Sequence, residues 1–326
     1  PVPGNGADSE LKRTDFAVNA VVDISDAATE TFGVNYYNED GSSEGFLELG
    51  PGFIVPNSFD FDRSVTGAFG ELHYEADNGV TVLASMRHDD SDENGAETTS
   101  RFGLIYELDS GQTSIRANWG QGFALPGFFA LGSPLVGNPD LNPQKSTSVD
   151  LGVSHWAKNG RIGATLTLFS NETKDMIDFD AEVFQIVNRD QLDSDGVELQ
   201  FTYRPSDSLS LQAHATYLDV DLVNSDDEIL QRPDWRGGLA VQWQPSESWL
   251  IDASWLSVGE SWDSSVPTGE ITLDGYNRVD VTATYRMTDK LSMLLSVDNL
   301  LDEEYEQAIG FSSPGVRPRL AVRYSF

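Results

Sequence analysis

The feature that most constrains the fold is an alternation of apolar and polar residues that recurs along the chain. It is clear in residues 15–24, 162–168, 197–203, 278–287 and 316–326. Alternation with a period of two places successive side chains on opposite faces of a β-strand. We count about fifteen segments of the length that a tilted membrane-spanning strand needs. Each has one apolar face and one face of charged or hydroxyl-bearing side chains.

Composition narrows the classes of protein and partner. The chain of 326 residues has a formal net charge of -33 and 39% hydrophobic residues, with a mean hydropathy of -0.32. No stretch approaches the roughly 18 apolar residues of a transmembrane helix, which excludes a helical membrane protein. Nucleic acid is excluded as a partner because no cluster of Lys and Arg is present to neutralise phosphates.

Short and long connections alternate strictly between the segments. The short ones are rich in Asp, Ser, Asn, Gly and Pro, as tight hairpins require, and lie near 25–29, 77–79, 109–111, 158–160, 205–208, 245–248 and 288–290. The long ones lie near 40–64, 89–97, 122–146, 172–195, 220–234, 260–275 and 303–315. Transmembrane barrels have tight periplasmic turns and long external loops, and soluble sandwiches do not. The pattern predicts an all-β fold, a transmembrane antiparallel up-and-down β-barrel.

The number of strands predicts part of a larger barrel. With the C-terminus on the periplasmic side, the loop lengths place residues 1–14 outside and make the count odd, whereas a closed barrel of one bacterial chain has an even count. We interpret residues 1–14 as an extracellular loop remnant and residues 15–326 as the C-terminal portion of the barrel. The alternatives are an ungated porin of about sixteen strands, if one strand is miscounted, and a soluble acidic β-domain that binds carbohydrate or calcium.

Two blocks of sequence resemble one known family. Residues 297–326 contain Asn299, Leu300, Asp302, Tyr305, Pro314, Gly315, Arg317 and the terminal Phe326. Residues 120–146 contain Asn138, Pro139, Leu141 and Pro143. In order and spacing, both blocks resemble the TonB-dependent outer-membrane transporters, most closely the cobalamin and catecholate-siderophore receptors. Leu301, Ala124 and Gln144 depart from the Phe, Arg and Glu that are usual in that family.

This resemblance implies a barrel of about twenty-two strands with a plugged lumen, of which the chain would supply about fifteen strands and no plug. It also implies import of a scarce ligand such as a ferric siderophore or cobalamin, across the outer membrane of a Gram-negative bacterium. Separately from the resemblance, we expect no catalysis, because the sequence has no Cys nucleophile and carboxylates are too abundant for any pair to stand out. The implied partners are outer-membrane lipid, a plug and the remaining strands in a second chain, and TonB acting through the plug. A surface lipoprotein is a further partner that the resemblance allows.

Candidate ligand contacts are aromatic and basic side chains in or before the 122–146 connection. They are Trp119, Phe123, Phe128, Phe129, Arg87, Arg101 and Arg116. The aromatic residues would form an apolar rim for a corrin or an aromatic chelate, or pack the connection onto itself. The arginines would meet an anionic ligand or carboxylates of the plug. We expect no resident cofactor.

Acidic clusters are the remaining candidates. Calcium prefers hard oxygen ligands, which Asp89, Asp90, Asp92 and Glu93 offer in one connection and Asp226, Asp227 and Glu228 in another. Neither cluster has the spacing of an EF-hand, and a solvated acidic face is the alternative. So much external negative charge repels anions within a Debye length of about 10 Å at 0.1 M salt. This favours a neutral or metal-bridged ligand.

Overall fold

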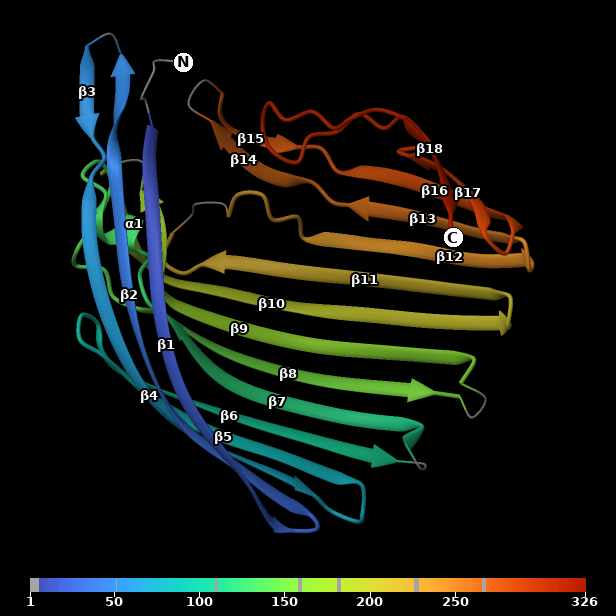
Figure 1. Cartoon of the computed structure of the whole chain (residues 1–326), viewed down its shortest axis with the longest axis horizontal. Coiled ribbons are helices and arrows are strands. Elements are labelled where there is room, and N and C mark those ends of the chain that lie inside the picture. Colours follow the sequence, from blue (N-terminus) through green and yellow to red (C-terminus); the bar gives the residue numbers. More distant parts are fainter. Residues whose placement is uncertain are drawn as a thin grey trace. The chain divides into compact units, whose positions relative to one another are not determined.

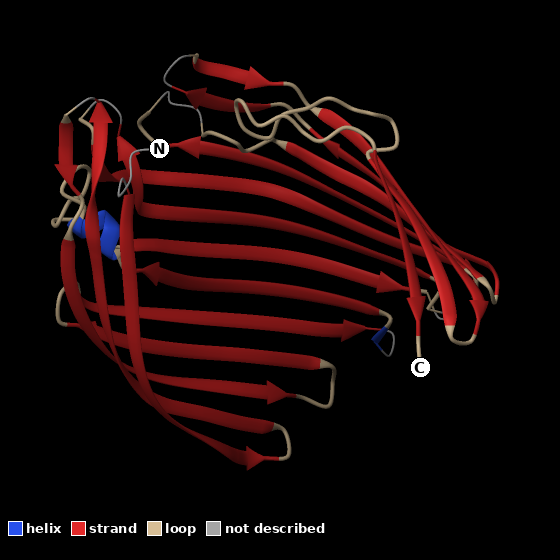
Figure 2. Ribbon diagram, turned by 45° about the horizontal axis from the view of Figure 1, so that its top comes forward, coloured by secondary structure: helices blue, strands red, loops and turns tan. Residues whose placement is uncertain are grey.

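The structure is a computed structural model of the whole chain, and it describes residues 6–50, 52–108, 111–157, 160–180, 183–225, 229–265 and 268–326. Antiparallel strands dominate these residues (Figure 2). Fifteen strands follow one another along one hydrogen-bonded path in sequence order (Figure 1). The predicted all-β antiparallel fold and the predicted count of about fifteen strands are therefore confirmed.

The strands on this path are β1 (Gly6–Ser25), β2 (Ala28–Gly50), β4 (Phe59–Glu75), β5 (Val80–Ser91), β6 (Gly95–Leu108), β7 (Thr113–Ala124), β8 (Gln144–Trp156), β9 (Ile162–Asp180), β10 (Gln185–Ser206), β11 (Leu209–Leu222), β12 (Trp235–Ser246), β13 (Trp249–Val258), β16 (Tyr276–Thr288), β17 (Leu291–Asp298) and β18 (Arg317–Tyr324). Three short strands lie off the path. β3 (Phe53–Pro56) pairs with the end of β2, and β14 (Ser261–Ser265) pairs with β15 (Gly269–Leu273). The helix α1 (Phe128–Gly132) lies in the connection between β7 and β8. Within the described ranges, no helix is long and apolar enough to cross a membrane.

Among the described residues, the predicted tight turns lie between successive strands where we expected them. Residues 109–110 and 158–159 of two of these turns lie outside the described residues. β1 ends at Ser25 and β2 begins at Ala28, for example, and β12 ends at Ser246 while β13 begins at Trp249. Several predicted long connections are instead mostly strand. β2 and β4 extend into 40–64, β5 and β6 leave only residues 92–94 of 89–97 between them, and β9 and β10 extend into 172–195. Those expectations were wrong because strand pairing continues wherever backbone groups find partners, whereas alternation is required only where one face is apolar.

The structure differs from the expected loop remnant at 1–14 from Gly6 onward, and residues 1–5 lie outside the described residues. β1 begins at Gly6, and its residues from Gly6 onward pair in register with β2, starting with Gly6 opposite Phe46. This stretch contains charged and small residues without a clean apolar face, so its sequence carried no strand signal. Backbone pairing to the long partner β2 nevertheless extends the strand.

Contacts divide the chain into two compact units. The first contains Pro1–Tyr106, Arg116–Val149 and Asn171–Asp193, and the second contains the remaining residues. In the first unit, the registers of β1, β2, β4, β5 and β6 place one set of side chains on a common apolar face. Its members are largely exposed large hydrophobic residues: Phe16, Val18, Phe32, Val34, Leu72, Tyr74, Met86, Phe102 and Tyr106. The opposite side of these strands is the polar face of the first unit.

The second unit has the same two-faced construction. On one face, β12, β13, β17 and β18 expose large apolar side chains: Leu239, Trp243, Trp255, Leu295, Leu320 and Val322. On the other, one row of opposed residues crosses β11, β12, β13, β16, β17 and β18: Ser210, Gln242, Asp252, Thr282, Ser296 and Arg319. An apolar face without a covering layer and an opposite polar face are the arrangement expected of a barrel wall in lipid.

Candidate functional site

A buried ion pair joins β2 to β4 on the polar face of the first unit. Arg63 donates from Nε and Nη2 to Oε2 of Glu39 at 3.1 and 2.6 Å, and each of the two residues is 8% exposed. Arg13 of β1 donates to Oε1 of the same glutamate at 3.2 Å. The register places the three residues opposite one another, so one carboxylate joins three strands.

The same arginine holds the connection between β7 and β8. Nη1 of Arg63 donates to the carbonyl oxygen of Pro126 at 2.9 Å, and its guanidinium carbon lies 4.8 Å from the centre of the Phe128 ring. Phe128 also stacks on Phe61, with 6.3 Å between ring centres. Phe128 therefore packs against β4, neither onto its own connection nor at a free rim. Phe129 is 54% exposed and is available to a ligand.

Arg87 already has its counter-charge. Nε donates to Oδ2 of Asp89 at 2.7 Å, Nη2 donates to Oδ1 of Asp89, and Nη2 also donates to Oδ1 of Asn35 at 2.7 Å. The group crosses over Gly67, where a Cβ would lie 2.4 to 2.6 Å from these three side chains. Glycine at this position is what lets the cluster span β2, β4 and β5. The paired Arg87 is a poor candidate for binding an anionic ligand.

Arg101 and Arg116 lie on strands of the first unit. Arg101 is exposed and lies beside Gly120, where a Cβ would be 3.4 Å from its Cγ. Among the residues that the structure describes, Arg101 makes no ion pair. Arg116 precedes Gly120 by four positions in β7, so strand alternation places it on the same polar face. These two arginines are basic candidates that share the polar face.

The aromatic candidates in β7 lie on the other side of the strand. Gly120 faces Arg101, and a Cβ at Gly122 would lie 3.1 Å from Oγ of Ser146, so both glycines belong to the polar face. Trp119 and Phe123 alternate with them and therefore point to the apolar face, where Trp119 is 37% exposed. The structure separates these two aromatic residues from Arg101 and Arg116, and they do not form one site with them.

The carboxylates of the first acidic cluster have different partners and lie on different faces. Asp89 is 4% exposed and pairs with Arg87, while Asp92 accepts hydrogen bonds from N–H and Oγ of Ser64 at 2.9 and 2.7 Å. Burial raises the pKa of Asp92, but the bonds from Ser64 outweigh it and hold this pKa below the usual value. Asp90 alternates with Asp89 and points to the opposite face.

Among the described residues, no group of three or more His, Asp or Glu side chains is placed to hold a metal ion. Glu93 follows Asp92 in the turn between β5 and β6. Asp226, Asp227 and Glu228 lie outside the described residues. Calcium binding by the acidic connections stays a prediction.

The motif at 138–143 folds the second half of the β7–β8 connection against β9 and β10. Leu141 is 4% exposed, Pro143 is buried and Pro139 is exposed. Oδ1 of Asn138 accepts the N–H of Asp140 at 3.0 Å. Asn188 of β10 clamps the segment, because it accepts the N–H of Asn142 at 2.9 Å and donates to the carbonyl oxygens of Asn142 and Asp175 at 3.2 and 2.8 Å. These residues shape the connection and leave its outer surface to vary.

The motif near the end of the chain orders the connection between β17 and β18. Asn299 is 3% exposed; its amide donates to the carbonyl oxygens of Glu303 and Pro314 at 2.9 and 3.3 Å, and its Oδ1 accepts the N–H of Glu303 at 2.9 Å. Oδ1 of Asp302 accepts the N–H of Val316 at 3.0 Å. A Cβ at Gly315 would lie 2.6 Å from that oxygen, which explains the glycine.

The other residues of this motif have mixed environments. Tyr305 stacks on Tyr276 with 3.8 Å between ring centres and accepts a hydrogen bond from Arg278 at 3.3 Å. Leu300 is 45% exposed, and Arg317 is exposed at the start of β18. The terminal Phe326 lies past the end of β18, with its ring against Tyr324 at 5.3 Å. The motif therefore combines one buried asparagine with residues that stay accessible.

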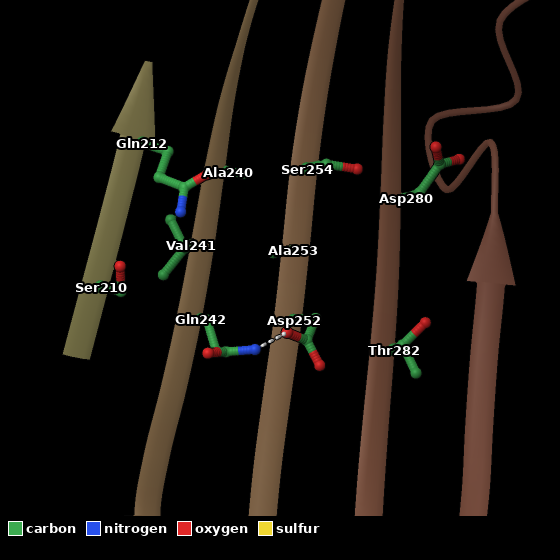
Figure 3. A pocket seen from close by; sticks show the side chains of 10 residues that line it. All are labelled: Ser210, Gln212, Ala240, Val241, Gln242, Asp252, Ala253, Ser254, Asp280 and Thr282. Carbon is green, nitrogen blue, oxygen red and sulfur yellow. Dashed lines mark hydrogen bonds between the residues drawn. The ribbon is translucent and has the colours of Figure 1, made fainter. Parts of the chain in front are cut away.

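The polar face of the second unit is hollowed between β11 and β16. The hollow has a volume of about 300 Å³, and Figure 3 shows its lining from four neighbouring strands. Nε2 of Gln242 donates to Oδ1 of Asp252 at 3.0 Å, the dashed line in Figure 3. Hydroxyl groups of Ser210, Ser254 and Thr282 complete much of the lining. No residue of the lining is apolar and large, so the hollow suits a polar occupant.

Comparison with known proteins identifies the family of the chain. A family model described as "TonB dependent receptor-like, beta-barrel" matches residues 3–300. The chain belongs to the TonB-dependent receptor family. This membership decides against both alternatives, the porin and the soluble acidic domain. The apolar faces of the receptor chain are the lipid-facing side, and the polar faces are the luminal side.

Relatives of the receptor chain carry the names of transporters. The vitamin B12 transporter BtuB of Vibrio cholerae serotype O1 is 28% identical over 277 residues, which cover 82% of this chain and 43% of the relative. BtuB of Photobacterium profundum is 29% identical over 230 residues, covering 68% of this chain and 36% of the relative. The chain thus spans less than half the length of these curated relatives.

Solved structures share the fold. The copper transporter OprC superposes with a TM-score of 0.80 at 18% identity, covering 100% of this chain and 58% of that chain. The siderophore receptor PirA from Pseudomonas aeruginosa superposes with a TM-score of 0.75 at 18% identity, covering 98% and 56%. The relatives and solved structures named here are transporters and receptors.

In the second unit of the receptor chain, the side chain of Asp263 joins three connections by hydrogen bonds. These are the connections near 220–234, 260–275 and 303–315. Asp263 of β14 is 3% exposed. Its carboxylate accepts hydrogen bonds from the N–H of Ile309 at 2.7 Å, from Nε2 of Gln231 at 3.1 Å and from the N–H of Ser264 at 2.9 Å. Burial raises the pKa of Asp263, but these donors outweigh it and hold this pKa below the usual value.

We expect this cluster to loosen in acid. Because the pKa of Asp263 is lowered in the folded protein, its stabilisation is complete above the unfolded pKa of about 3.9 and is lost as the pH falls through the folded value. After correction for the intrinsic rate, amide hydrogen exchange at Ile309 should be slow at pH 5 to 7 and accelerate below about pH 4. Asp263→Asn should remove this pH dependence, and equal acceleration in both proteins would contradict the assignment.

Sequence reasoning missed Glu39, Arg63, Asp252 and Asp263. Each is a charged residue inside a strand, where a single sequence gives no reason to prefer it over its neighbours. Arg63 and Glu39 are 24 positions apart and become partners only through the register of β2 and β4. One signal was present for Gly67 and Gly315: glycine within or beside a strand indicates close approach of another group.

Proposed function

We propose that the chain forms most of the wall and the outer connections of a TonB-dependent receptor in the outer membrane of a Gram-negative bacterium. In this proposal the receptor imports a scarce ligand too large for porins, with cobalamin ahead of ferric siderophores. A plug and the remaining strands complete the barrel, and TonB acts through the plug. The single observation that carries the proposal is membership of the receptor family.

The charge of the chain supports cobalamin ahead of ferric siderophores as the ligand. The formal net charge is -33, and the outer ends of the strands carry exposed carboxylates, among them Asp40, Glu44, Asp60, Asp62 and Asp90. A rim of this sign repels anionic ferric chelates and leaves a neutral corrinoid unaffected. The names of the sequence relatives, vitamin B12 transporters, point in the same direction.

Uptake by the complete receptor tests the proposal. The full-length gene is expressed in a bacterium that lacks its own cobalamin and siderophore receptors, and uptake of radiolabelled cyanocobalamin is measured with and without functional TonB. We expect saturable uptake that disappears without TonB. Uptake of ferric enterobactin in its place would reverse the order of ligands, and TonB-independent, non-saturable entry of small solutes would overturn the proposal.

Charge at the rim gives a second readout. If external carboxylates repel anions, then binding of an anionic ferric chelate should strengthen as salt rises from 10 mM to 150 mM, whereas cobalamin binding should hardly change. The reason is that the Debye length falls from about 30 Å to about 8 Å over this range. Equal salt dependence for both ligands would contradict the electrostatic part of the proposal.

A further inference from the structure

The hollow in the polar face of the second unit contains one carboxylate that has no cationic partner. Of the two acidic residues in its lining, Asp280 accepts a hydrogen bond from Nε of Arg278 at 3.0 Å and from the N–H of Asn299 at 2.9 Å. Asp252 has only the amide of Gln242, at 3.0 Å, and forms no ion pair with any residue that the structure describes. The lining contains no Lys or Arg.

The surroundings of Asp252 suit a cation and oppose an anion. Asp252 is half-buried, and a partly desolvated carboxylate is costly without a counter-charge. Figure 3 shows Ser254 on the same strand as Asp252, and Thr282 on the neighbouring strand β16. Their hydroxyl oxygens and Oε1 of Gln242 are acceptors for the remaining protons of an ammonium or guanidinium group. Because Gln242 holds Asp252 in place, little ordering would be needed when a cation binds.

The hollow begins near the tight-turn end of β11 and crosses the middle of β12, β13 and β16. Asp252 is three residues past Trp249, the first residue of β13, and Ser210 is one residue past Leu209, the first residue of β11. In a receptor barrel the tight turns are periplasmic, so a ligand held by the outer connections is at the opposite ends of these strands. The occupant must also come from the lumen, because the adjacent Ala253 and Trp255 lie on the lipid-facing side.

We propose that this hollow receives a Lys or Arg side chain of the receptor's plug, with Asp252 as its counter-ion. The inference rests on the proposed function, which supplies the plug. The volume of about 300 Å³ has room for the end of one long side chain and is small for a corrinoid or a siderophore. The contact would fix the plug to β11, β12, β13 and β16, and it adds no requirement to ligand recognition by the outer connections.

Photo-crosslinking in the full-length receptor tests where the plug lies. Benzoylphenylalanine is placed at Ser254, on the rim of the hollow, or at Trp255, the next residue of β13 and on the lipid-facing side. We expect crosslinks from position 254 to a plug peptide that contains Lys or Arg, identified by mass spectrometry, and none to the plug from position 255. Crosslinks from 254 only to lipid or to barrel peptides would overturn the inference.

Charge substitution tests the role of Asp252. With Asp252→Asn, loss of a hydrogen-bonded charge contact should make opening of the plug more frequent, so that protease cleaves it roughly tenfold faster. Asp289→Asn removes the same charge at an exposed turn and should leave the rate unchanged. Asp252→Lys combined with an acidic substitution of the crosslinked plug residue should restore slow cleavage. Unchanged cleavage in Asp252→Asn, or no rescue, would contradict the inference.

The two proposals can fail separately. TonB-dependent uptake is measured on the wild-type receptor, whereas the crosslink and the cleavage rate are read on purified protein without ligand or TonB. Uptake with no plug contact at position 254 would leave the proposed function intact and remove Asp252 from the plug contact. A plug contact without uptake of any tested ligand would keep the inference and overturn the import function.

Discussion

An Arg63→Ala variant of the receptor is expected to lose about 3–5 kcal/mol of unfolding free energy, because removing one partner leaves a buried charge without its counter-ion. Glu39 is 8% exposed and would keep only the partly exposed Arg13 as a donor. The carbonyl oxygen of Pro126 would lose its donor as well. Urea-induced unfolding in lipid vesicles, followed by tryptophan fluorescence, measures the loss.

Arg13→Ala is the matched control, since it removes the other arginine from the same glutamate. The side chain of Arg13 is 46% exposed, so the expected cost is below about 1 kcal/mol. A double variant, Arg63→Met with Glu39→Gln, should lose less than Arg63→Ala because no charge is left buried. Similar losses for Arg63→Ala and Arg13→Ala would show that the Glu39–Arg63 pair is not the main contact.

The same substitution should free the β7–β8 connection. Arg63 bonds to Pro126 and lies on the ring of Phe128, so its loss removes both of its contacts with this connection and leaves the stacking of Phe128 on Phe61. We therefore expect protease to cut near α1 in Arg63→Ala before the barrel unfolds. The Asn188 contacts hold the later part of this connection independently, and cleavage there should not change.

The lipid-crossing part of the fold was predictable from single-residue patterns. Where one face meets lipid, every second residue must be apolar, so segments such as 162–168 and 278–287 identify both the strand and its face. Outside the lipid this requirement ends. The outer half of β2 has a mixed sequence, yet it pairs with β4 as far as Ser43 opposite Phe59. Only the partner strand determines that structure, and a partner distant in sequence leaves no local signal.

The candidate site was predictable only in part, because contacts between strands that are distant in sequence leave no local signal. The motif residues Asn299, Asp302 and Gly315 were singled out through their resemblance to a family, and the structure gives each a physical role in one connection. Phe128 was singled out for its residue type, but its partner Phe61 comes from a distant strand. Asp252 was not predicted, because its lack of a cation is visible only when four strands are placed side by side.

Asn299→Ala is expected to have the second largest effect on stability, about 2–4 kcal/mol, from buried groups left without partners. The asparagine side chain makes three hydrogen bonds to the backbone of Glu303 and Pro314. Its backbone also has a positive φ of 52°, which asparagine tolerates and alanine adopts only at a cost. The free energy of unfolding and protease cleavage within 303–315 both report the change.

Two variants separate these contributions. Asn299→Asp keeps the oxygen that accepts the N–H of Glu303 and tolerates the positive φ, but it no longer donates to the two carbonyl oxygens, so an intermediate loss is expected. Leu300→Ala alters the next residue of the motif, which is 45% exposed, and should cost less than about 1 kcal/mol.

Because Asp280 accepts the backbone N–H of Asn299, and also contacts Arg278 beside Tyr305, the loss in Asn299→Ala should spread to the Tyr276–Tyr305 stack. If cleavage within 303–315 were as slow in Asn299→Ala as in Leu300→Ala, the buried asparagine would not be what orders this connection.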